Sequence, residues 1–462
     1  MEYEAMMEAL RPGKHAHLVG IGGVSMCALG EVLHGAGVRV TGSDMKESAA
    51  VEHLREVGVP VVIGHVGESV KGADCVIRTA AVRDDNPEIV AAHEAGIPVY
   101  ERAQAWGALM RKYRNAICIA GTHGKTTTTS MTTHIFMEAH ADPTVMIGGT
   151  LPLLGAGHRV GKGDTIILES CEYRNSFLSF SPTVAVILNV EADHLDFFKD
   201  LEDIQQSFRT FALQTPAQTG VVVVNRDDAG AMESVRGIPR RMLTFGMEPT
   251  ADVYCADLRM EENLPVFDVM YRGQRYARVA LCVPGQHNIY NALAAAAVAV
   301  ALGISGDAIE AGLKGFHGSE RRFQYRGTYR GARVYDDYAH HPSELHALLQ
   351  AAKALPYDRV VCAFQPHTYT RTKAFFDDFV KELQGADVIL LAEIYAAREQ
   401  NTVGISAKDV AARIPGSRYF PTLEELTEHL REIAKPGDLI LTVGAGDIYT
   451  VGEALVDETK QN

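Results

Sequence analysis

A short loop between an apolar run and a helical stretch carries the clearest chemical signal in this sequence. The run Ala116–Ala120 has the composition of a buried parallel strand. The residues that follow it are Gly121, Thr122, His123, Gly124, Lys125 and Thr126. Glycines let backbone N–H groups converge on an anion, and the start of a helix adds partial positive charge. Lys125 can reach terminal phosphates and the Thr126 hydroxyl can ligate Mg²⁺, so the pattern predicts a phosphate-binding loop for a nucleoside triphosphate.

The loop does not have the common spacing of such motifs. A first glycine five residues before Gly124 would fall on Ile119. A tight strand-to-helix turn with an incidental lysine is therefore the alternative interpretation. Threonine nevertheless occupies positions 126 to 129, including Thr127. Because threonine is a mediocre helix former, this run needs a reason to open a helix, and phosphate binding supplies one.

Carboxylates and a histidine follow the next predicted strands. Glu169 comes directly after the run 165–168, while Asp193 and His194 follow the run 184–188. Side chains at the carboxyl ends of adjacent parallel strands converge on the crevice where open α/β sheets bind ligands. Carboxylate oxygens suit Mg²⁺ beside phosphates. A structural histidine is the alternative for His194, but its acidic neighbours and the phosphate loop favour a functional role.

Amide and guanidinium groups downstream can bind a nucleotide. Asn288 and Asn291 are three residues apart and share one face of a helix predicted over 288–302, where their amides can act together. An N-cap followed by a solvated asparagine is the alternative. Arg322 follows Arg321, and a guanidinium fork suits a phosphate, although a solvated linker would look the same.

Two clusters that contain histidine lie near the C-terminal third, at 336–344 and 364–372. Their polar residues are Asp337, His340 and His341 in the first, and His367 and Arg371 in the second. Adjacent histidines suggest a metal, but Pro342 and the lack of nearby thiols weaken that interpretation. We favour recognition of a phosphate, a ribose or a carboxylate, with surface loops as the alternative.

The first predicted strand ends in another glycine-rich turn. Gly20, Gly22 and Gly23 form it, and Asp44 lies about two dozen residues further on, as in dinucleotide-binding turns. The third glycine of that fingerprint would fall on Ser25, which weakens the match. The turn suits a nicotinamide cofactor and another diphosphate-bearing ligand about equally, because a helix N-terminus binds either. A purely structural turn is the third interpretation.

Three α/β domains are needed to position these residues. The chain has 462 residues, and about 150 residues per domain is usual. Strands alternate with helical stretches in the first and last thirds, as in doubly wound folds. Residues 252–283 instead alternate like antiparallel strands at the edge of a mostly parallel sheet. We predict domains at 1–113, 114–322 and 323–462.

Composition excludes several classes of protein. The formal net charge of −14 argues against a nucleic-acid partner, which would require a basic surface. The seven cysteines are scattered without a Cys-x-x-Cys pair, which disfavours a zinc site and fits a reducing cytosol. The N-terminus lacks the apolar segment of a signal peptide, and the longest apolar run, near 292–302, is too short to span a bilayer. We expect a cytoplasmic enzyme without membrane insertion.

Together, the motifs resemble those of the Mur ligase family, the ATP-dependent amide ligases of peptidoglycan precursor synthesis. The matching segments, in chain order, are GIGGVSM, GSD, GTHGKTTTT, LESCEYRNSF, NVEADHLD, GQHNIYNALAA, GSERRF, DDYAHHPSE, FQPHTYTRT and VGAGD. They run from the first strand to near the C-terminus, so the resemblance covers essentially the whole chain. The set is far more specific than any single motif.

The resemblance implies a Rossmann-like N-terminal domain for a UDP-sugar, a central phosphate-loop ATPase domain with a mostly parallel sheet, and a Rossmann-like C-terminal α/β domain. The implied UDP contacts are Gly20, Gly22, Gly23, Val24, Ser25, Met26, Ser43 and Asp44. ATP is implied on Gly121 to Thr127, with catalytic Lys125 on the γ-phosphate, and magnesium on Thr126 and on the catalytic residues Glu169 and His194. Further implied nucleotide contacts are Asn288, Asn291, Arg322 and Asp337, and further implied substrate contacts are His340, His341, His367 and Arg371.

The implied reaction joins the lactyl carboxylate of UDP-N-acetylmuramate to L-alanine through an acyl phosphate, with ATP and Mg²⁺, and leaves the oligomeric state open. The alternatives are a sibling ligase that attaches a whole peptide, a phosphate-loop ATPase without ligase activity, and a nicotinamide dehydrogenase. The chain departs from the family pattern at two positions. Thr368 replaces the first arginine of FQPHRYSRT, so His367 and Arg371 remain for the substrate carboxylate. Arg209 stands where several siblings carry a carbamylated lysine, so that modification is not expected.

Overall fold

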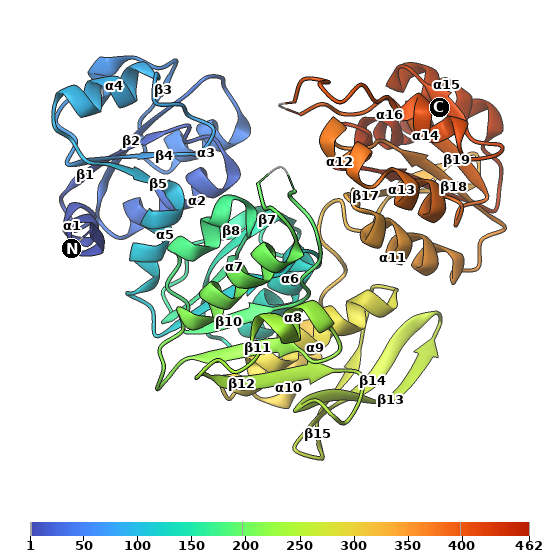
Figure 1. Cartoon of the computed structure of the whole chain (residues 1–462), viewed down its shortest axis with the longest axis horizontal. Coiled ribbons are helices and arrows are strands. Elements are labelled where there is room, and N and C mark those ends of the chain that lie inside the picture. Colours follow the sequence, from blue (N-terminus) through green and yellow to red (C-terminus); the bar gives the residue numbers. More distant parts are fainter. Residues whose placement is uncertain (1, 196, 398, 462) are drawn as a thin grey trace.

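Three separate β-sheets organise the chain in this computed structural model (Figure 1). The structure describes residues 2–195, 197–397 and 399–461, so Asp196, the last residue of the NVEADHLD motif, lies outside the described residues. The strands of the three sheets come from residues 15–101, 115–280 and 324–443. We call these the N-terminal, middle and C-terminal parts. The predicted domain boundaries fall between the sheets, and in Figure 1 the two outer parts lie on opposite sides above the middle part.

The N-terminal part is a five-stranded parallel sheet in the order β3-β2-β1-β4-β5. Its strands are β1 (His15–Val19), β2 (Arg39–Asp44), β3 (Val61–Ile63), β4 (Cys75–Arg78) and β5 (Val99–Glu101). Its helices are α1 (Glu2–Ala9), α2 (Val24–Gly35), α3 (Ala49–Glu56), η1 (Gly67–Val70), α4 (Pro87–Glu94) and α5 (Arg102–Met110). The strand order changes direction between β1 and β4, so the turn after β1 opens at the crevice where such sheets bind ligands.

The middle part is a ten-stranded sheet in the order β15-β14-β13-β12-β11-β10-β6-β9-β7-β8. Its strands are β6 (Asn115–Ala120), β7 (Thr144–Leu151), β8 (Ala156–Arg159), β9 (Thr165–Glu169), β10 (Val184–Ile187), β11 (Val221–Asn225), β12 (Arg241–Gly246), β13 (Val253–Glu261), β14 (Leu264–Tyr271) and β15 (Gln274–Ala280). Its helices are α6 (Lys125–Glu138), η2 (Tyr173–Ser179), α7 (Leu201–Leu213), α8 (Ala229–Ser234), α9 (Gln286–Ala301) and α10 (Gly306–Lys314). Because β6 lies between β10 and β9 and parallel to both, the loops after these strands end at one edge.

The C-terminal part is a six-stranded sheet in the order β16-β17-β21-β18-β19-β20. Its strands are β16 (Gln324–Tyr329), β17 (Ala332–Asp337), β18 (Arg359–Phe364), β19 (Val388–Ala392), β20 (Arg418–Phe420) and β21 (Asp438–Val443). Its helices are α11 (Pro342–Lys353), α12 (Tyr369–Ala374), α13 (Phe376–Leu383), α14 (Ala407–Ala412), α15 (Leu423–Ile433) and α16 (Tyr449–Gln461). In the described parts of the chain, no helix is both long enough and apolar enough to cross a membrane.

The predicted α/β fold with three sheets is confirmed, and so is the antiparallel edge at 252–283, which forms β13, β14 and β15. The sequence analysis did not predict the strands at the opposite edge of the middle sheet. There β7 and β8 pair antiparallel, but β7 contains Gly148 and Gly149, and β8 has the short sequence AGHR. Neither segment shows the alternation of apolar and polar residues by which a half-buried strand is recognised.

The N-terminal and middle parts share one apolar core, which includes Trp106 and Phe177. At this contact α5 runs against the backbone of η2. A Cβ atom built on Gly107 would lie 1.8 Å from the carbonyl oxygen of Ser179, and the Tyr3 hydroxyl donates a hydrogen bond to the same oxygen at 2.6 Å. The approach of α5 to the middle part therefore requires glycine at position 107.

Gly107→Ala is expected to lower the melting temperature, because the added methyl group must push α5 away from Ser179. Overpacking of this kind costs about 1–3 kcal/mol in the free energy of unfolding. Scanning calorimetry of this variant beside Gly35→Ala checks the prediction. Gly35 ends α2, and the nearest atom to a Cβ built there lies at 3.6 Å, so alanine should be tolerated. Equal melting temperatures for the two variants would show that α5 can accept a methyl group at position 107 without loss of stability.

Candidate active site

The phosphate loop joins β6 to α6 at the edge where β9 and β10 also end. Gly124 caps α6 with a φ of 82°, a left-handed conformation that favours glycine. A Cβ atom built on Gly124 would lie 2.5 Å from Asn291 Oδ1 on α9. Glycine is therefore required at position 124 for two reasons: the left-handed backbone conformation there, and the close approach of α9.

The threonines that open α6 are buried and bonded within the middle part. The hydroxyls of Thr129 and Thr132 donate to the carbonyls of Lys125 and Thr128, one turn earlier, each at 2.8 Å. The Thr128 hydroxyl instead donates to Asn291 Oδ1 at 3.1 Å. These bonds satisfy polar groups that are cut off from water. The threonine run thus has a packing role besides the role predicted for Thr126.

Lys125 is held by its own loop and by a carboxylate that sequence reasoning did not assign. Its ammonium group donates to the carbonyls of Gly121 and Thr122, the latter at 3.0 Å, and lies 3.0 Å from Glu172 Oε2. The Lys125 side chain is 14% exposed and that of Glu172 is 3% exposed. Burial lowers the pKa of Lys125, but Glu172 outweighs this effect and raises the pKa above its ordinary value. Lys125 therefore stays charged at neutral pH.

Thr126 and Glu169, two of the three predicted magnesium ligands, meet at the start of α6. The Thr126 hydroxyl donates to Glu169 Oε1 at 3.1 Å, and the Gly148 N–H group donates to Glu169 Oε2 at 2.7 Å. Oxygen donors of this kind suit Mg²⁺, so the pair fits the ion. The third predicted ligand, His194, lies 3.9 Å from Glu172, which places it beside the carboxylate that binds Lys125.

A cavity of about 380 Å³ lies between the phosphate loop, α9 and the C-terminal part. Its lining includes seven residues that were predicted to contact the nucleotide, namely His123, Gly124, Thr127, Asn288, Asn291, Arg322 and Asp337. The volume is in the usual range for a small-molecule site. The structure thus brings together residues from four distant segments of the chain, as a nucleotide site requires.

One wall of this cavity was missed by sequence reasoning. Asn225 ends β11, and Asp227 follows it and accepts a hydrogen bond from the Tyr290 hydroxyl at 3.0 Å; all three residues line the cavity. The rule that selected Glu169, a polar residue at the end of a parallel strand, applies equally to Asn225 and Asp227. The signal was therefore present in the sequence.

Arg322 and Asp337 close the cavity from the C-terminal side. A guanidinium nitrogen of Arg322 lies 3.5 Å from Thr126 Oγ1, and the group stacks 5.3 Å from the ring centroid of Tyr338. Asp337 accepts two backbone N–H groups at 2.7 and 2.8 Å. Burial raises the pKa of Asp337 to about 6, although Arg322 acts in the opposite direction. A fixed positive charge thus stands beside the phosphate loop.

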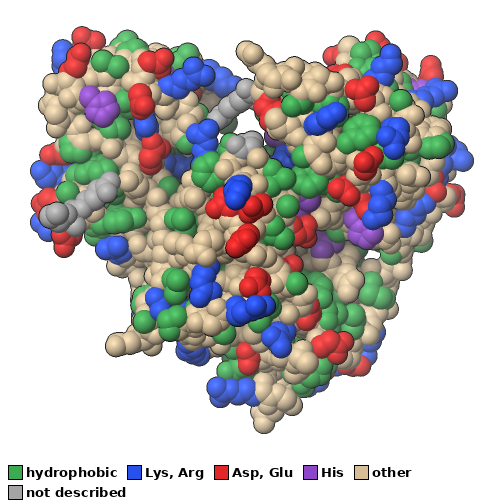
Figure 2. Space-filling view, viewed as in Figure 1, with side chains coloured by type: hydrophobic (Ala, Val, Ile, Leu, Met, Phe, Trp, Pro, Cys, Tyr) green, Lys and Arg blue, Asp and Glu red, His purple; other side chains and the backbone are tan. Residues whose placement is uncertain are grey.

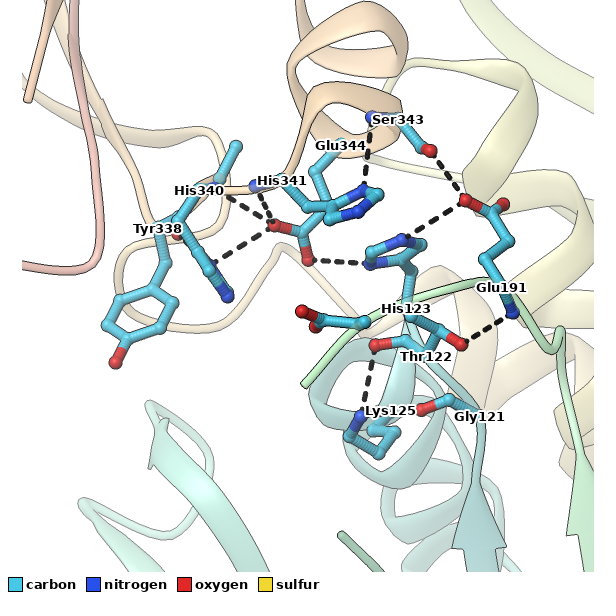
Figure 3. Close-up of polar contacts among 12 residues, drawn as sticks. Gly121, Thr122, His123, Lys125, Glu191, Tyr338, His340, His341, Ser343 and Glu344 are labelled. Carbon is cyan, nitrogen blue, oxygen red and sulfur yellow. Dashed lines mark hydrogen bonds and ion pairs between the residues drawn. The ribbon is translucent and has the colours of Figure 1, made fainter. Parts of the chain in front are cut away.

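Four residues connect the phosphate loop to the start of α11, and we call them the His123 clasp: His123, Glu191, Ser343 and Glu344 (Figure 3). His123 Nδ1 lies 3.1 Å from Glu344 Oε1, and His123 Nε2 lies 3.6 Å from Glu191 Oε2. The Ser343 hydroxyl donates to Glu191 Oε2 at 2.5 Å. The clasp therefore joins the middle part to the C-terminal part at the predicted nucleotide site.

The His123 clasp is a network of charged groups. Burial lowers the pKa of His123, but Glu344 and Glu191 outweigh it and raise the pKa to about 9. The ion pair with His123 in turn helps lower the pKa of Glu191 to about 2. Glu344 also accepts the backbone N–H groups of His340 and His341, at 2.9 and 3.2 Å, so the first turn of α11 holds its carboxylate in place.

His340 and His341 open α11 as neutral side chains. Burial lowers the pKa of His340 to about 4 and also lowers that of His341. His340 Nδ1 lies 3.0 Å from the carbonyl oxygen of Tyr338, and the His340 ring lies 5.9 Å from that of His367. His341 Nδ1 accepts the N–H group of Ser343 at 3.3 Å and caps the helix. Of the two histidines, His340 is the one whose ring lies near His367, another predicted substrate contact.

A larger cavity, of about 920 Å³, is lined by all three parts of the chain. Figure 2 shows a hollow between the N-terminal and C-terminal parts, with acidic and basic side chains intermixed around it. Among the described residues, the charged and imidazole lining of the cavity consists of Arg83, Arg102, Arg174, His194, His367 and Arg371, against the two acids Asp193 and Glu399. Such a set suits an anionic ligand with phosphates or carboxylates. Sequence reasoning assigned no role to the first three arginines. Arg83 and Arg102 lie outside the motifs, and Arg174 lies inside LESCEYRNSF, where only Glu169 was given a role.

Arg371 was predicted to bind the substrate carboxylate, and its fork already holds a carboxylate of the protein. Its Nη2 and Nε atoms lie 3.0 and 3.3 Å from Asp193 Oδ1. Its Nη1 atom lies 3.3 Å from His367 Nδ1. Thr368 turns the chain here with a φ of 66°. A substrate carboxylate at this position must therefore replace Asp193 or bind beside it.

The predicted UDP turn lies at the start of α2, where several of its polar groups are bonded within the N-terminal part. The Gly22 N–H group donates to Asp44 Oδ2 at 2.8 Å. Ser43 is buried, and its hydroxyl donates to Glu88 Oε2 at 2.6 Å. The other predicted contacts, at this turn and the first turn of α2, are Gly20, Gly23, Val24, Ser25 and Met26. A diphosphate would meet the backbone N–H groups that open α2.

Three family models match successive parts of the chain. They describe the Mur ligase family catalytic domain (residues 15–114), the Mur ligase middle domain (residues 119–299) and the Mur ligase glutamate ligase domain (residues 321–446). A UDP-N-acetylmuramate–L-alanine ligase from Caldanaerobacter subterraneus subsp. tengcongensis is 45% identical over 453 residues, which are 97% of this chain and 98% of that protein.

Solved structures agree with these matches. The UDP-N-acetylmuramate–alanine ligase of Thermotoga maritima superposes with a TM-score of 0.79 at 30% identity, over 97% of this chain and 99% of that one. A murein peptide ligase from Psychrobacter arcticus shares the fold, with a TM-score of 0.71 at 24% identity, over 96% of this chain and 98% of that one. This chain therefore belongs to the Mur ligase family.

Proposed function

We propose that this chain is an ATP-dependent ligase that joins the lactyl carboxylate of UDP-N-acetylmuramate to the amine of L-alanine. Family membership and the full-length similarity to ligases of that name support the proposal. The geometric observation that carries it is a link between the two cavities. Lys125 on the phosphate loop lies 3.0 Å from Glu172, and His194, which lines the larger cavity, lies 3.9 Å from the same carboxylate. A phosphoryl donor and its acceptor would meet at this link.

The proposed reaction has two steps because a carboxylate is a poor acyl donor. An oxygen of the substrate carboxylate attacks the γ-phosphorus of ATP, the bond to the ADP oxygen breaks, and an acyl phosphate forms. The amine of alanine then attacks the acyl carbon and loses a proton, and inorganic phosphate leaves as the amide forms. Phosphate leaves far more readily than oxide, so the first step makes the second possible.

The residues around the loop supply fixed charge for the transfer. Lys125 and Arg322 both lie at the phosphate loop, and each is held by other groups of the protein. Charges that are positioned before the reaction stabilise the negative charge that develops on the transferred group without further reorganisation. Thr126 and Glu169, with His194 as the third predicted ligand, would hold Mg²⁺, which when bound neutralises phosphate charge.

The proposal implies small-molecule partners and a location. ATP, UDP-N-acetylmuramate and L-alanine are the substrates. Seven of the proposed nucleotide contacts line the smaller cavity, and His194, His367 and Arg371 line the larger one. We propose the cytoplasm as the place of the reaction, since the reaction consumes ATP and a nucleotide-linked sugar.

Phosphate release with ATP and UDP-N-acetylmuramate, scanned over amino acids and short peptides, tests the proposal. L-Alanine is expected to be the best amine, with glycine and L-serine weaker, because a pocket that fits one methyl group gains only about 1–3 kcal/mol from it. A peptide that outcompetes L-alanine tenfold would assign the chain to the peptide-attaching ligases. Equal phosphate release without the sugar nucleotide would instead indicate a simple ATPase.

Lys125→Ala is expected to lower kcat for ligation by about 100-fold or more, because it removes a charge beside the transferred phosphoryl group. The substitution also leaves Glu172 buried without its partner, so the double variant Lys125→Ala/Glu172→Gln is the folding control. The double variant should melt close to the wild type and remain inactive. Turnover near the wild-type rate in either folded variant would contradict the role of Lys125.

The His123 clasp predicts a pH-dependent contribution to stability. The pKa of His123 is about 9 in the folded protein, against about 6.5 in an unfolded chain, so its charge stabilises the fold fully below about pH 6.5. This stabilisation is lost as the pH rises through about 9. Glu344→Gln removes a carboxylate that raises this pKa, so the variant should melt well below the wild type at pH 6.5 and closer to it at pH 9.5.

Differential scanning fluorimetry across this pH range checks the prediction. Glu382→Gln on α13 is the matched control, because Glu382 pairs with His346, whose side chain is 56% exposed. That exposed pair should contribute little at any pH. A difference between the wild type and Glu344→Gln that stays constant with pH would show that the clasp does not depend on the charge of His123.

A further inference from the structure

Three side chains that can ligate a metal converge outside the candidate active site, at the contact between the N-terminal and middle parts. Glu31 lies on α2, His53 on α3 and His158 on β8. Helix α2 packs against α3 within its own part and against β7 and β8 of the middle part (Figure 1). The group is therefore assembled by the packing of two separate sheets.

The ligand atoms of this group converge, because both histidines direct their Nε2 atoms at the carboxylate of Glu31. His53 Nε2 and His158 Nε2 lie 3.0 and 2.7 Å from the same atom, Glu31 Oε2. The two rings lie 6.1 Å apart, edge to face, and the three ligand atoms all lie within 4.8 Å of one another. In a tetrahedral zinc site with bonds of about 2.0–2.1 Å, ligand atoms are about 3.4 Å apart. The two distances to Glu31 Oε2 are shorter than this value by 0.4 and 0.7 Å, so rearrangement of the three side chains on the scale of an ångström would admit an ion.

We propose that Glu31, His53 and His158 form a binding site for one divalent transition-metal ion of the Zn²⁺ type. Two imidazole nitrogens and one carboxylate oxygen are the donors of three-ligand zinc sites, in which water takes the fourth position. Imidazole also distinguishes such an ion from Mg²⁺, which prefers oxygen donors. The His53 side chain is 45% exposed and that of His158 is 11% exposed, so an ion can enter from solvent and keep a water ligand.

The neighbouring groups are compatible with this assignment. Hydrogen bonding to His158 is the main cause that lowers the pKa of Glu31 to about 2, so its carboxylate is ionised at neutral pH. Cys27 lies one turn before Glu31 on α2, but it is buried, and burial raises its pKa to about 11. Its thiol donates to the carbonyl oxygen of Ala50 at 3.8 Å and is not among the atoms that converge, so the ligand set is the two histidines and the glutamate.

An ion at this site would tie two parts of the protein together. Glu31 and His53 belong to the N-terminal part and His158 to the edge strand of the middle part. Helix α2 begins about two turns before Glu31, at the turn proposed for UDP, so the ion would fix that turn relative to β8. The metal site is inferred from its own geometry and does not depend on the proposed reaction.

Calorimetric titration of the metal-free, full-length protein with ZnCl₂, in excess Mg²⁺, tests the proposal. The wild type should bind one equivalent of Zn²⁺ that is lost in both His53→Gln and His158→Gln. His34→Gln, at an exposed position of α2, should retain it. So should His341→Gln, which probes the other group of this kind among the described residues, His123, Glu191 and His341. Co²⁺ in place of Zn²⁺ should give a visible absorption band that disappears in the same two variants.

Two results would overturn the proposal. The first is no Zn²⁺ binding by the wild type, or binding that both His53→Gln and His158→Gln retain, which would leave the three residues as an ion-paired network only. The second is loss of binding in His158→Gln alone. Because His53 is nearly half exposed, its replacement carries little risk to the fold, so retained binding there would mean that His158→Gln acts through a folding defect.

Discussion

Where the phosphate loop meets α6, buried positive charges must be paired with carboxylates. These carboxylates come from the middle part and from the C-terminal part. Lys125 and His123 belong to one loop, and each is held by a carboxylate, Glu172 for the lysine and Glu344 for the histidine. A buried ion left without its partner destabilises a protein by several kcal/mol. Because Glu344 comes from α11, His123 has this partner only when the C-terminal part is in contact with the middle part, whereas Lys125 is paired within the middle part.

The middle part contacts the N-terminal part mainly through apolar side chains and the C-terminal part through polar and charged ones. Trp106 of α5 belongs to the same apolar core as Phe177 and Phe208, so the N-terminal and middle parts are joined through a shared interior. The C-terminal part has apolar clusters of its own and contacts the middle part through polar pairs such as Ser343 with Glu191 and Arg371 with Asp193. Charged contacts depend on pH and salt, while apolar burial hardly does. The candidate active site thus lies at a contact between parts whose strength depends on pH and salt concentration.

Local patterns were enough to find the residues that lie on the ends of parallel strands. Gly124, Lys125 and Glu169 were recognised because a strand, a turn and a polar residue occur in fixed order along the chain. The same rule extends to Asn225 and Asp227, and it was not applied there. Glu172 follows the same strand as Glu169, and Glu344 lies in the cluster at 336–344, but the partner of each could not be predicted, because it depends on how helices and sheets pack. The short edge strand β8 was missed because it has too few residues to show a period.

The sequence by itself determined the α/β class, the phosphate loop, the polar residues at the strand ends and, through the whole set of motifs, the family. These features are local, since turn geometry and the alternation of strands and helices depend on neighbouring residues. Tertiary structure alone decided that Glu172 holds Lys125, that His123 is clasped between Glu191 and Glu344, and that Asp193 occupies the fork of Arg371. Each of these pairs joins residues that are distant in the chain, and burial, which makes an unpaired charge costly, is created only when the sheets pack together.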